Sequence, residues 1–222
     1  MVLCDLDILQ MMTEGVFDKA FLSNVNPASI DLSLGEEIRD VDGHLIDKLG
    51  KSDEFVIKPN QFVLAHTLER INMPINLLGI VKGKSSLARK GLIVEFAGFI
   101  DPGFTGQITL ELKNVSDKPV TLKKYMRICQ LCFLKMDHAP RYPYGSDEDS
   151  HYQHQMGAVA SRNDCFVDID GKTAVDVEIH DHRDEDECGV FRVRDISVGG
   201  ISKSDKDRID GIIKKILGED DD

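Results

Sequence analysis

The strand-like run Ile108-Thr109-Leu110-Glu111-Leu112 follows shortly after the turn Asp101-Pro102-Gly103-Phe104, and this pairing of a turn with a short strand decides the fold class. Runs of the same kind are rich in β-branched and apolar residues and are separated by Gly, Pro, Asn and Asp; they occur at 30–34, 62–65, 78–81 and 128–134. Many short strands with few helices favour a mainly β fold, a β-barrel or jelly roll, up to about Lys135.

One helix and one hairpin complete this part of the chain. The segment 5–14 reads as a short helix because three apolar residues share a face: Ile8, Leu9 and Met12. We expect Asp5 to cap its N-terminus and Gly15 to end it. The pair Asp42-Gly43 between two β-rich runs predicts a tight hairpin turn.

Composition limits the classes of function. The chain has 222 residues, 41% of them apolar, which is enough for one sizeable domain with a real core. Its formal net charge of −12 disfavours nonspecific binding to nucleic acid, although a small triphosphate can still bind to local cations. No apolar run is long enough to span a membrane and no secretory signal is visible, so we expect a cytoplasmic protein. Five cysteines in such a chain indicate reduced thiols.

Cys129 and Cys132 form a CxxC pair, a pattern that can bind zinc or carry redox chemistry. They lie in a run that reads as a strand, where a spacing of three places the two side chains on opposite faces. A zinc site also needs two further ligands at matching spacing, and the HxE and PCxxC elements of zinc-dependent deaminases are missing. We therefore interpret the pair as part of the core and expect no protein-bound metal.

Two segments follow the β-rich part. Residues 140–162 show little periodicity and read as an arm or lid. Residues 163–222 hold 18 acidic and 9 basic residues, a net charge of −9 that leaves −3 for the rest. This acidic extension has its own hairpin signal at Asp170-Gly171 and a closing amphipathic helix, while His180-Asp181-His182 matches no known metal-site spacing and reads as a solvated loop. We predict a domain at 1–162 with an acidic extension at 163–222.

Polar side chains gather at turns and strand ends in the middle of the chain. The box Lys84-Ser85-Ser86-Leu87-Ala88-Arg89 offers hydroxyls and a guanidinium, and Ser85 and Arg89, four residues apart, share a face of a helical turn. Glu111 is a lone carboxylate in an otherwise apolar strand, and such a group can act as base and then as acid when water displaces ammonia from an aromatic carbon. Taken alone, the box is also consistent with a capped surface helix, Glu111 with an outward-facing strand residue and Phe104 with a core aromatic.

Six segments occur in the order found in the dCTP deaminase branch of the dUTPase-like superfamily, and the chain resembles that family from its first helix to Arg162. They are PASIDLSLG, KSSLAR, IDPGF, TLEL, PYGS and YQHQMGAVASR. The resemblance implies a homotrimer of distorted jelly-roll subunits, with sites built between neighbouring chains and Mg²⁺ carried in on the substrate triphosphate. It also implies a zinc-independent enzyme that removes the 4-amino group of dCTP, giving ammonia and dUTP for thymidylate synthesis.

The resemblance assigns catalytic roles to four positions. Glu111 matches the residue that moves the proton. Ser85 and the backbone carbonyl of Ala97 match the groups that hold the attacking water, and Arg89 matches the residue that supports charge near the reacting centre.

The resemblance also assigns positions that bind the nucleotide. Asp101 matches the contact to the sugar 3′-hydroxyl, and Phe104 matches an aromatic ring under the deoxyribose. Gln155 would read the base edge through its amide. The remaining substrate-binding positions are Lys84, Ser86, Tyr144 and His151, which would receive phosphates, and Thr109 in the TLEL segment.

Three departures from the family pattern keep alternatives open. Phe96 stands where these deaminases usually carry Thr, and His151 stands where a lysine is expected. The spacing from Ser85 to Asp101 is one residue shorter, as in trimeric dUTPases, where the matching aspartate activates water for attack on the α-phosphate. The leading interpretation is a dCTP deaminase. The alternatives are a bifunctional enzyme that forms dUMP and pyrophosphate, a dUTPase, and a catalytically silent nucleotide-binding regulator.

Overall fold

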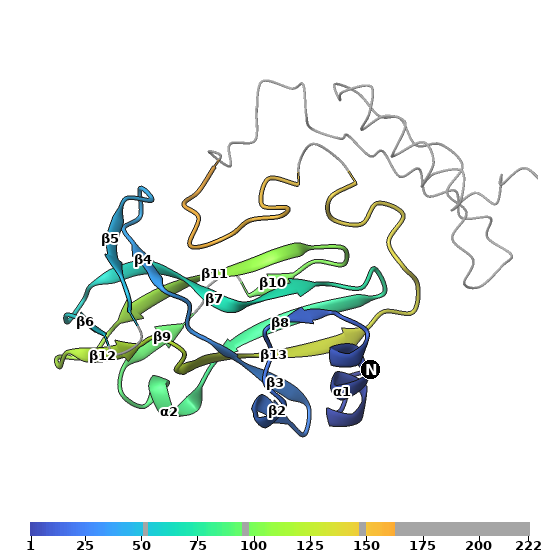
Figure 1. The fold of residues 1–222 in the computed structure, drawn as a ribbon, viewed down its shortest axis with the longest axis horizontal. Coiled ribbons are helices and arrows are strands. Elements are labelled where there is room, and N and C mark those ends of the chain that lie inside the picture. Colours follow the sequence, from blue (N-terminus) through green and yellow to red (C-terminus); the bar gives the residue numbers. More distant parts are fainter. Residues whose placement is uncertain (51–52, 95–97, 147–149, 163–222) are drawn as a thin grey trace, which may run out of the picture. The chain divides into compact units, whose positions relative to one another are not determined.

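The structure is a computed structural model that describes residues 1–50, 53–94, 98–146 and 150–162 (Figure 1). The chain divides into two units, 1–162 and 163–222, and the fold described here is that of the first. The hairpin, helix and His180-Asp181-His182 loop expected in the acidic extension lie outside the described residues, as do Phe96 and Ala97. These expectations stay predictions.

The described elements are mostly short strands. The helical segments are α1 (Asp5–Thr13), the 3₁₀ turn η1 (Leu22–Asn24) and α2 (Ser85–Ala88). The strands are β1 (Phe17–Asp18), β2 (Val25–Asn26), β3 (Ser29–Ser33), β4 (Glu37–Arg39), β5 (Leu45–Lys48), β6 (Glu54–Ile57), β7 (Phe62–Asn72), β8 (Leu77–Gly83), β9 (Leu92–Val94), β10 (Phe99–Ile100), β11 (Thr105–Asn114), β12 (Val120–Lys123) and β13 (Arg127–Lys135). The expected mainly β fold is therefore confirmed.

The strands form two main antiparallel sheets. One has the order β10-β8-β13-β3-β2, and the other has the order β5-β4-β7-β11-β9 with β1 also paired to β7. β12 and β6 form a separate ribbon. Since neighbours in a sheet are seldom neighbours in sequence, the chain crosses repeatedly between the sheets (Figure 1), as in a jelly roll.

Both main sheets contribute to one core. Its fully buried side chains alternate with half-buried ones along the second half of β11 and most of β13, whereas consecutive residues of β3 and of the first half of β7 are all buried. They include Ile30 and Leu32 of β3, Val63 and Ala65 of β7, Leu110 and Leu112 of β11, and Leu131 and Phe133 of β13. Cys129 belongs to this core, whereas Cys132 is half-buried and its thiol donates to the carbonyl of Ile80. The interpretation of the CxxC pair as structural fits both positions.

The start of α1 differs from the prediction. Its N-cap is Cys4 and not Asp5. The reason is the position of Asp7, three residues beyond the cap, whose carboxylate accepts the backbone N–H of Cys4 at 2.8 Å. Gly15 follows the helix with φ of 79°, the left-handed conformation that ends helices, so its expected role is confirmed.

The hairpin expected at Asp42-Gly43 joins β4 to β5, and Gly43 has φ of 85°. KSSLAR forms the expected helical turn, α2, with Lys84 as its N-cap. Within the described ranges, no helix combines the length and apolar character needed to cross a bilayer.

Candidate active site

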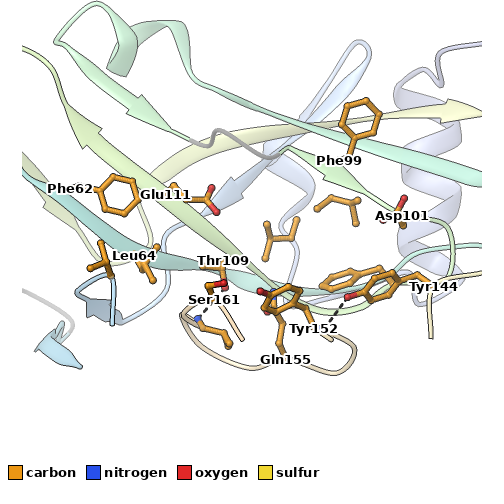
Figure 2. A pocket seen from close by; sticks show the side chains of 15 residues that line it. Phe62, Leu64, Phe99, Asp101, Thr109, Glu111, Tyr144, Tyr152, Gln155 and Ser161 are labelled. Carbon is orange, nitrogen blue, oxygen red and sulfur yellow. Dashed lines mark hydrogen bonds between the residues drawn. The ribbon is translucent and has the colours of Figure 1, made fainter. Parts of the chain in front are cut away.

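A cavity of about 510 Å³ lies over β7 and β11, between the turn that follows β10 and the end of the arm, residues 150–162 (Figure 2). This volume is within the range of small-molecule sites, and its lining is mainly apolar with a few polar groups, as is usual for them. Six of the predicted site residues line it: Asp101, Phe104, Thr109, Glu111, Tyr144 and Gln155. The other lining residues are Val41, Phe62, Leu64, Phe99, Ile100, Ile108, Tyr152, Val159 and Ser161.

β11 places Glu111 and Thr109 on the cavity side of the sheet. Side chains alternate along the strand, so the two residues face away from Leu110 and Leu112, which are buried in the core. Glu111 is half-buried and lies opposite Leu64 of β7, and Figure 2 shows it beside an apolar wall. A carboxylate in this setting can exchange protons with a bound ligand.

The turn after β10 brings Asp101 and Phe104 to the cavity. Gly103 has φ of 91°, and a Cβ at this position would lie 2.7 Å from the carbonyl oxygen of Tyr144, so both backbone conformation and space require glycine. Phe104 is buried with its ring 5.9 Å from that of Tyr144, whereas Asp101 is exposed. The cavity therefore has an aromatic floor beside an accessible carboxylate.

Tyr144 presents a protonated phenol. Its hydroxyl accepts the backbone N–H of Tyr152 at 2.8 Å. Burial raises the pKa of Tyr144, and the negative charge of Asp101 acts in the same direction. The hydroxyl therefore keeps its own proton at neutral pH and can donate it to an acceptor such as a phosphate oxygen.

Gln155 is buried beside β11. Its side-chain Nε2 donates to the carbonyl of Gln107 at 2.7 Å, and its own backbone carbonyl accepts the N–H of Gln107 at 3.0 Å. Thr109 is also bonded to the arm, because its hydroxyl accepts the N–H of Val159 at 3.1 Å. The arm thus closes one side of the cavity.

The KSSLAR box lies elsewhere. Ser85, Ser86 and Arg89 are exposed on or next to α2, and none of them lines the cavity. The ammonium of Lys84 lies 2.6 Å from the carboxylate of Asp31, which is 1% exposed. A single chain therefore does not bring the box together with Glu111, and Lys84 forms an ion pair inside the protein.

Two further predicted residues are not brought to the cavity. His151 is half-buried and does not line it, and its backbone carbonyl accepts a hydrogen bond from the guanidinium of Arg162 at 2.6 Å. Ala97 lies outside the described residues.

Sequence reasoning did not single out the apolar wall of the cavity. Phe62 and Leu64 belong to a run that reads as continuously apolar, so nothing in it marks which residues face a ligand. Tyr152 and Ser161 were available as candidates, because both belong to the YQHQMGAVASR segment.

One group of potential metal ligands is found in the described part of the chain. Asp40, Asp42 and His44 lie at the β4–β5 turn with their ligand atoms within 4.8 Å of one another. The carboxylate of Asp40 accepts the backbone N–H groups of Asp42 and His44, which is an ordinary turn interaction. The group therefore needs no metal to explain it.

Comparison with known proteins agrees with the segments identified in the sequence. A dCTP deaminase-like family model matches residues 2–136. The dUMP-forming dCTP deaminase of a Sulfurihydrogenibium species is 40% identical over 186 residues, which cover 77% of this chain and all of the relative. The dCTP deaminase of Halorubrum lacusprofundi is 38% identical over 184 residues, which cover 73% of this chain and 91% of the relative.

A solved structure agrees at the level of the fold. The crystal structure of 2′-deoxycytidine 5′-triphosphate deaminase from Agrobacterium tumefaciens superposes with a TM-score of 0.52 at 21% identity, over 60% of this chain and 47% of that one. The family model covers more than half of the chain and the two curated relatives align over most of their own lengths. The chain belongs to the dCTP deaminase-like family.

Proposed function

We propose that the protein is an enzyme that deaminates dCTP by hydrolysis, giving dUTP and ammonia. One observation carries the proposal: Glu111 shares a cavity with Gln155, Phe104 and Asp101. These are the side chains expected to move the proton, read the base and hold the sugar.

The chemistry asks one group to move a proton more than once. Glu111 takes a proton from water as the water oxygen bonds to C4 of cytosine, and passes this proton to the ring nitrogen N3. It then takes the proton of the new C4 hydroxyl and delivers it to the amino nitrogen as the bond from C4 to that nitrogen breaks, so that ammonia leaves and a C4 carbonyl remains. A half-buried carboxylate on a rigid strand suits this sequence of transfers because its position does not change between them.

The triphosphate needs positive charge that the cavity lining does not supply. Among the described residues, no Lys or Arg lines the cavity, whereas Arg89 is exposed on the same chain. We infer that a neighbouring copy in a homotrimer presents its α2 to the cavity. Ser85 and the Ala97 carbonyl would then hold the water, Arg89 would stabilise charge at the reacting centre, and Ser86 would bind phosphate.

The arm and the metal complete the expected contacts. Tyr144 and His151 would donate to phosphate oxygens. Lys84 would also bind phosphate, from the position in which its ion pair with Asp31 holds it. Mg²⁺ would be carried in on the substrate triphosphate and held by its phosphates, and no protein ligand is assigned to it. The metal would neutralise phosphate charge when the substrate binds.

A second step, from dUTP to dUMP and pyrophosphate, has specific support. Asp101 is a second carboxylate in the cavity and can activate a water for attack on the α-phosphate. The short spacing from Ser85 to Asp101 is the one associated with trimeric dUTPases. The name of the Sulfurihydrogenibium relative, dUMP-forming, agrees with this spacing.

Product analysis tests both steps. The full chain is incubated with dCTP or dUTP and Mg²⁺, and dUTP, dUMP, pyrophosphate and ammonia are resolved and measured. Ammonia from dCTP supports deamination, dUMP from either substrate supports the second step, and dUMP from dUTP without ammonia from dCTP contradicts the deaminase assignment. Activity that returns with Mg²⁺ alone after chelation supports zinc independence, and size measurements in solution test the trimer.

A further inference from the structure

The arm is bonded to the first half of β11 almost residue by residue. The N–H of His154 donates to the carbonyl of Thr105 at 2.6 Å, and the N–H of Gln107 donates to the carbonyl of Gln155 at 3.0 Å. The approach is so close that a Cβ on Gly106 would lie 2.9 Å from the Gln155 carbonyl oxygen. The arm therefore packs against β11 like an added strand.

Gln107 makes the largest number of these connections. Its side chain is buried, its Nε2 donates to the carbonyl of Leu68 in β7 at 3.0 Å, and its Oε1 accepts the N–H of Gly157 at 2.7 Å. Its backbone carbonyl accepts Nε2 of Gln155. Gln107 therefore connects the arm to β7 and β11, the two strands over which the cavity lies.

A side chain of the arm, Gln153, in turn bonds to the backbone at the start of β11. Gln153 of the arm accepts the N–H of Thr105 at 2.8 Å through Oε1 and donates to the carbonyl of Gly103 at 2.9 Å through Nε2. The strand therefore holds the arm through Gln107, and the arm holds the start of the strand through Gln153.

These contacts also fix the orientation of the Gln155 amide. Nε2 is the end that donates to the carbonyl of Gln107, and this bond uses one of its two N–H groups. Gln155 lines the cavity, so its Oε1 and its second N–H are the groups with which the amide can bind a nucleobase.

We propose that Gln107 is a positioning residue that holds the arm closed and fixes the orientation of the Gln155 amide, which would contact the nucleobase. The claim that Gln107 holds the arm, the arm part of the proposal, rests on the contacts alone. The claim that the Gln155 amide contacts a nucleobase, the nucleobase part, rests on the proposed function. Nucleotide binding needs the closed arm. The apparent affinity is therefore the affinity of the closed state multiplied by the fraction of molecules in which the arm is closed, and a looser arm lowers that fraction. The chemical step is spared because Glu111 lies further along β11, beyond the residues that hold the arm.

The test compares two variants of Gln107 in the full chain. Gln107→Met keeps the volume and removes the side-chain hydrogen bonds. Gln107→Glu keeps an acceptor for Gly157 and loses the donor to Leu68. Gln130→Met on β13 is the matched control, because no side-chain bond to the arm is found for Gln130 in the described structure. Hydrogen exchange of arm peptides is measured without nucleotide, and kcat and KM are measured with dCTP and Mg²⁺.

We expect arm exchange to rise about three- to tenfold in Gln107→Met, the factor for one net hydrogen bond, with KM raised by at most that factor and kcat changed less than about twofold. Gln107→Glu keeps the bond to Gly157 but places a buried carboxylate oxygen against the carbonyl of Leu68, so its arm exchange should also exceed that of wild type, and the control should not differ from wild type. Unchanged arm exchange in Gln107→Met, or equal changes in the control, would overturn the proposal. If dCTP is not a substrate, the nucleobase part fails with the proposed function, while hydrogen exchange still decides the arm part.

Discussion

Replacing Glu69 with glutamine should remove a decrease in the free energy of unfolding that occurs as the pH rises and the buried Glu69 carboxyl ionises. Glu69 on β7 is fully buried. Its Oε2 accepts the backbone N–H of Ser33 at 2.8 Å, and its Oε1 has no hydrogen-bond partner among the described residues. Burial raises the pKa of Glu69 above its ordinary value of 4.5, and the hydrogen bond from Ser33 opposes this only in part.

The sign of the effect follows from which state binds the proton more tightly. Below pH 4.5 the carboxyl of Glu69 is protonated in both the folded and the unfolded chain, so it imposes no penalty. As the pH rises above 4.5 the unfolded chain releases this proton first, and the folded state loses stability until the pH passes the raised pKa. The loss amounts to about 1.4 kcal/mol for each unit by which the pKa is raised.

The Glu69→Gln variant would carry a different and constant cost. A glutamine side chain can accept from Ser33 as the carboxyl does, and its unpaired Nε2 costs about 1–3 kcal/mol at every pH. The informative quantity is therefore the change with pH, because the difference in unfolding free energy should move in favour of Glu69→Gln between pH 4 and pH 8.

Urea denaturation at pH 4, 6.5 and 8 measures this difference while avoiding the isoelectric point near 5.0. Protein concentration is held fixed because assembly adds to stability. Glu36→Gln is the control with opposite sign: the ammonium of Lys124, 2.7 Å away, lowers the pKa of Glu36, so this variant should become less stable relative to wild type as the pH rises to about 4.5 and show no further change above it. If Glu69→Gln behaves like Glu36→Gln, a cation partners Glu69 in solution and the reasoning is refuted.

Four other predictions concern the site. Glu111→Gln should lower the rate of ammonia release at least ~100-fold while dCTP still binds, as measured by turnover and calorimetry; activity near that of wild type would remove Glu111 from its role. Arg89→Ala should assemble and unfold like wild type but turn over poorly, since the exposed guanidinium adds no core volume; loss of assembly with activity lost in proportion would make Arg89 structural. Truncation after Arg162 should preserve deamination, and an inactive but assembled product would place part of the site in the extension. Asp101→Asn should reduce dUMP formation or nucleotide binding more than ammonia release from saturating dCTP, and equal losses would contradict separate roles.

Local sequence patterns predicted much of the fold. Turn residues and runs rich in β-branched and apolar residues located the major strands, because buried strands favour such side chains. Alternation along β11 places Glu111 on the other face of the strand from the core residues Leu110 and Leu112. Strand lengths were underestimated where polar residues are buried inside a strand, as His66 and Glu69 are in β7.

Other features depend on contacts between distant segments. The N-cap Cys4 was missed because a cysteine is an uncommon cap and Asp7 supplies the bond. The pairing of Lys84 with Asp31 joins residues 53 positions apart, and no local pattern marks it. The contact between the arm and β11 likewise pairs residues about 50 positions apart in a segment without periodicity.

The placement of the two cavity carboxylates bears on how one site can run two hydrolyses. Glu111 lies beside Phe62 and Leu64, whereas Asp101 lies near Tyr144, and Figure 2 shows them toward different ends of the cavity. In the proposed function, a nucleotide bound once would meet Glu111 at its base and Asp101 at its sugar and α-phosphate. Each carboxylate would then activate its own water, and neither reaction would need the other's base. Such a division would explain why the shorter spacing from Ser85 to Asp101 is compatible with a glutamate on β11.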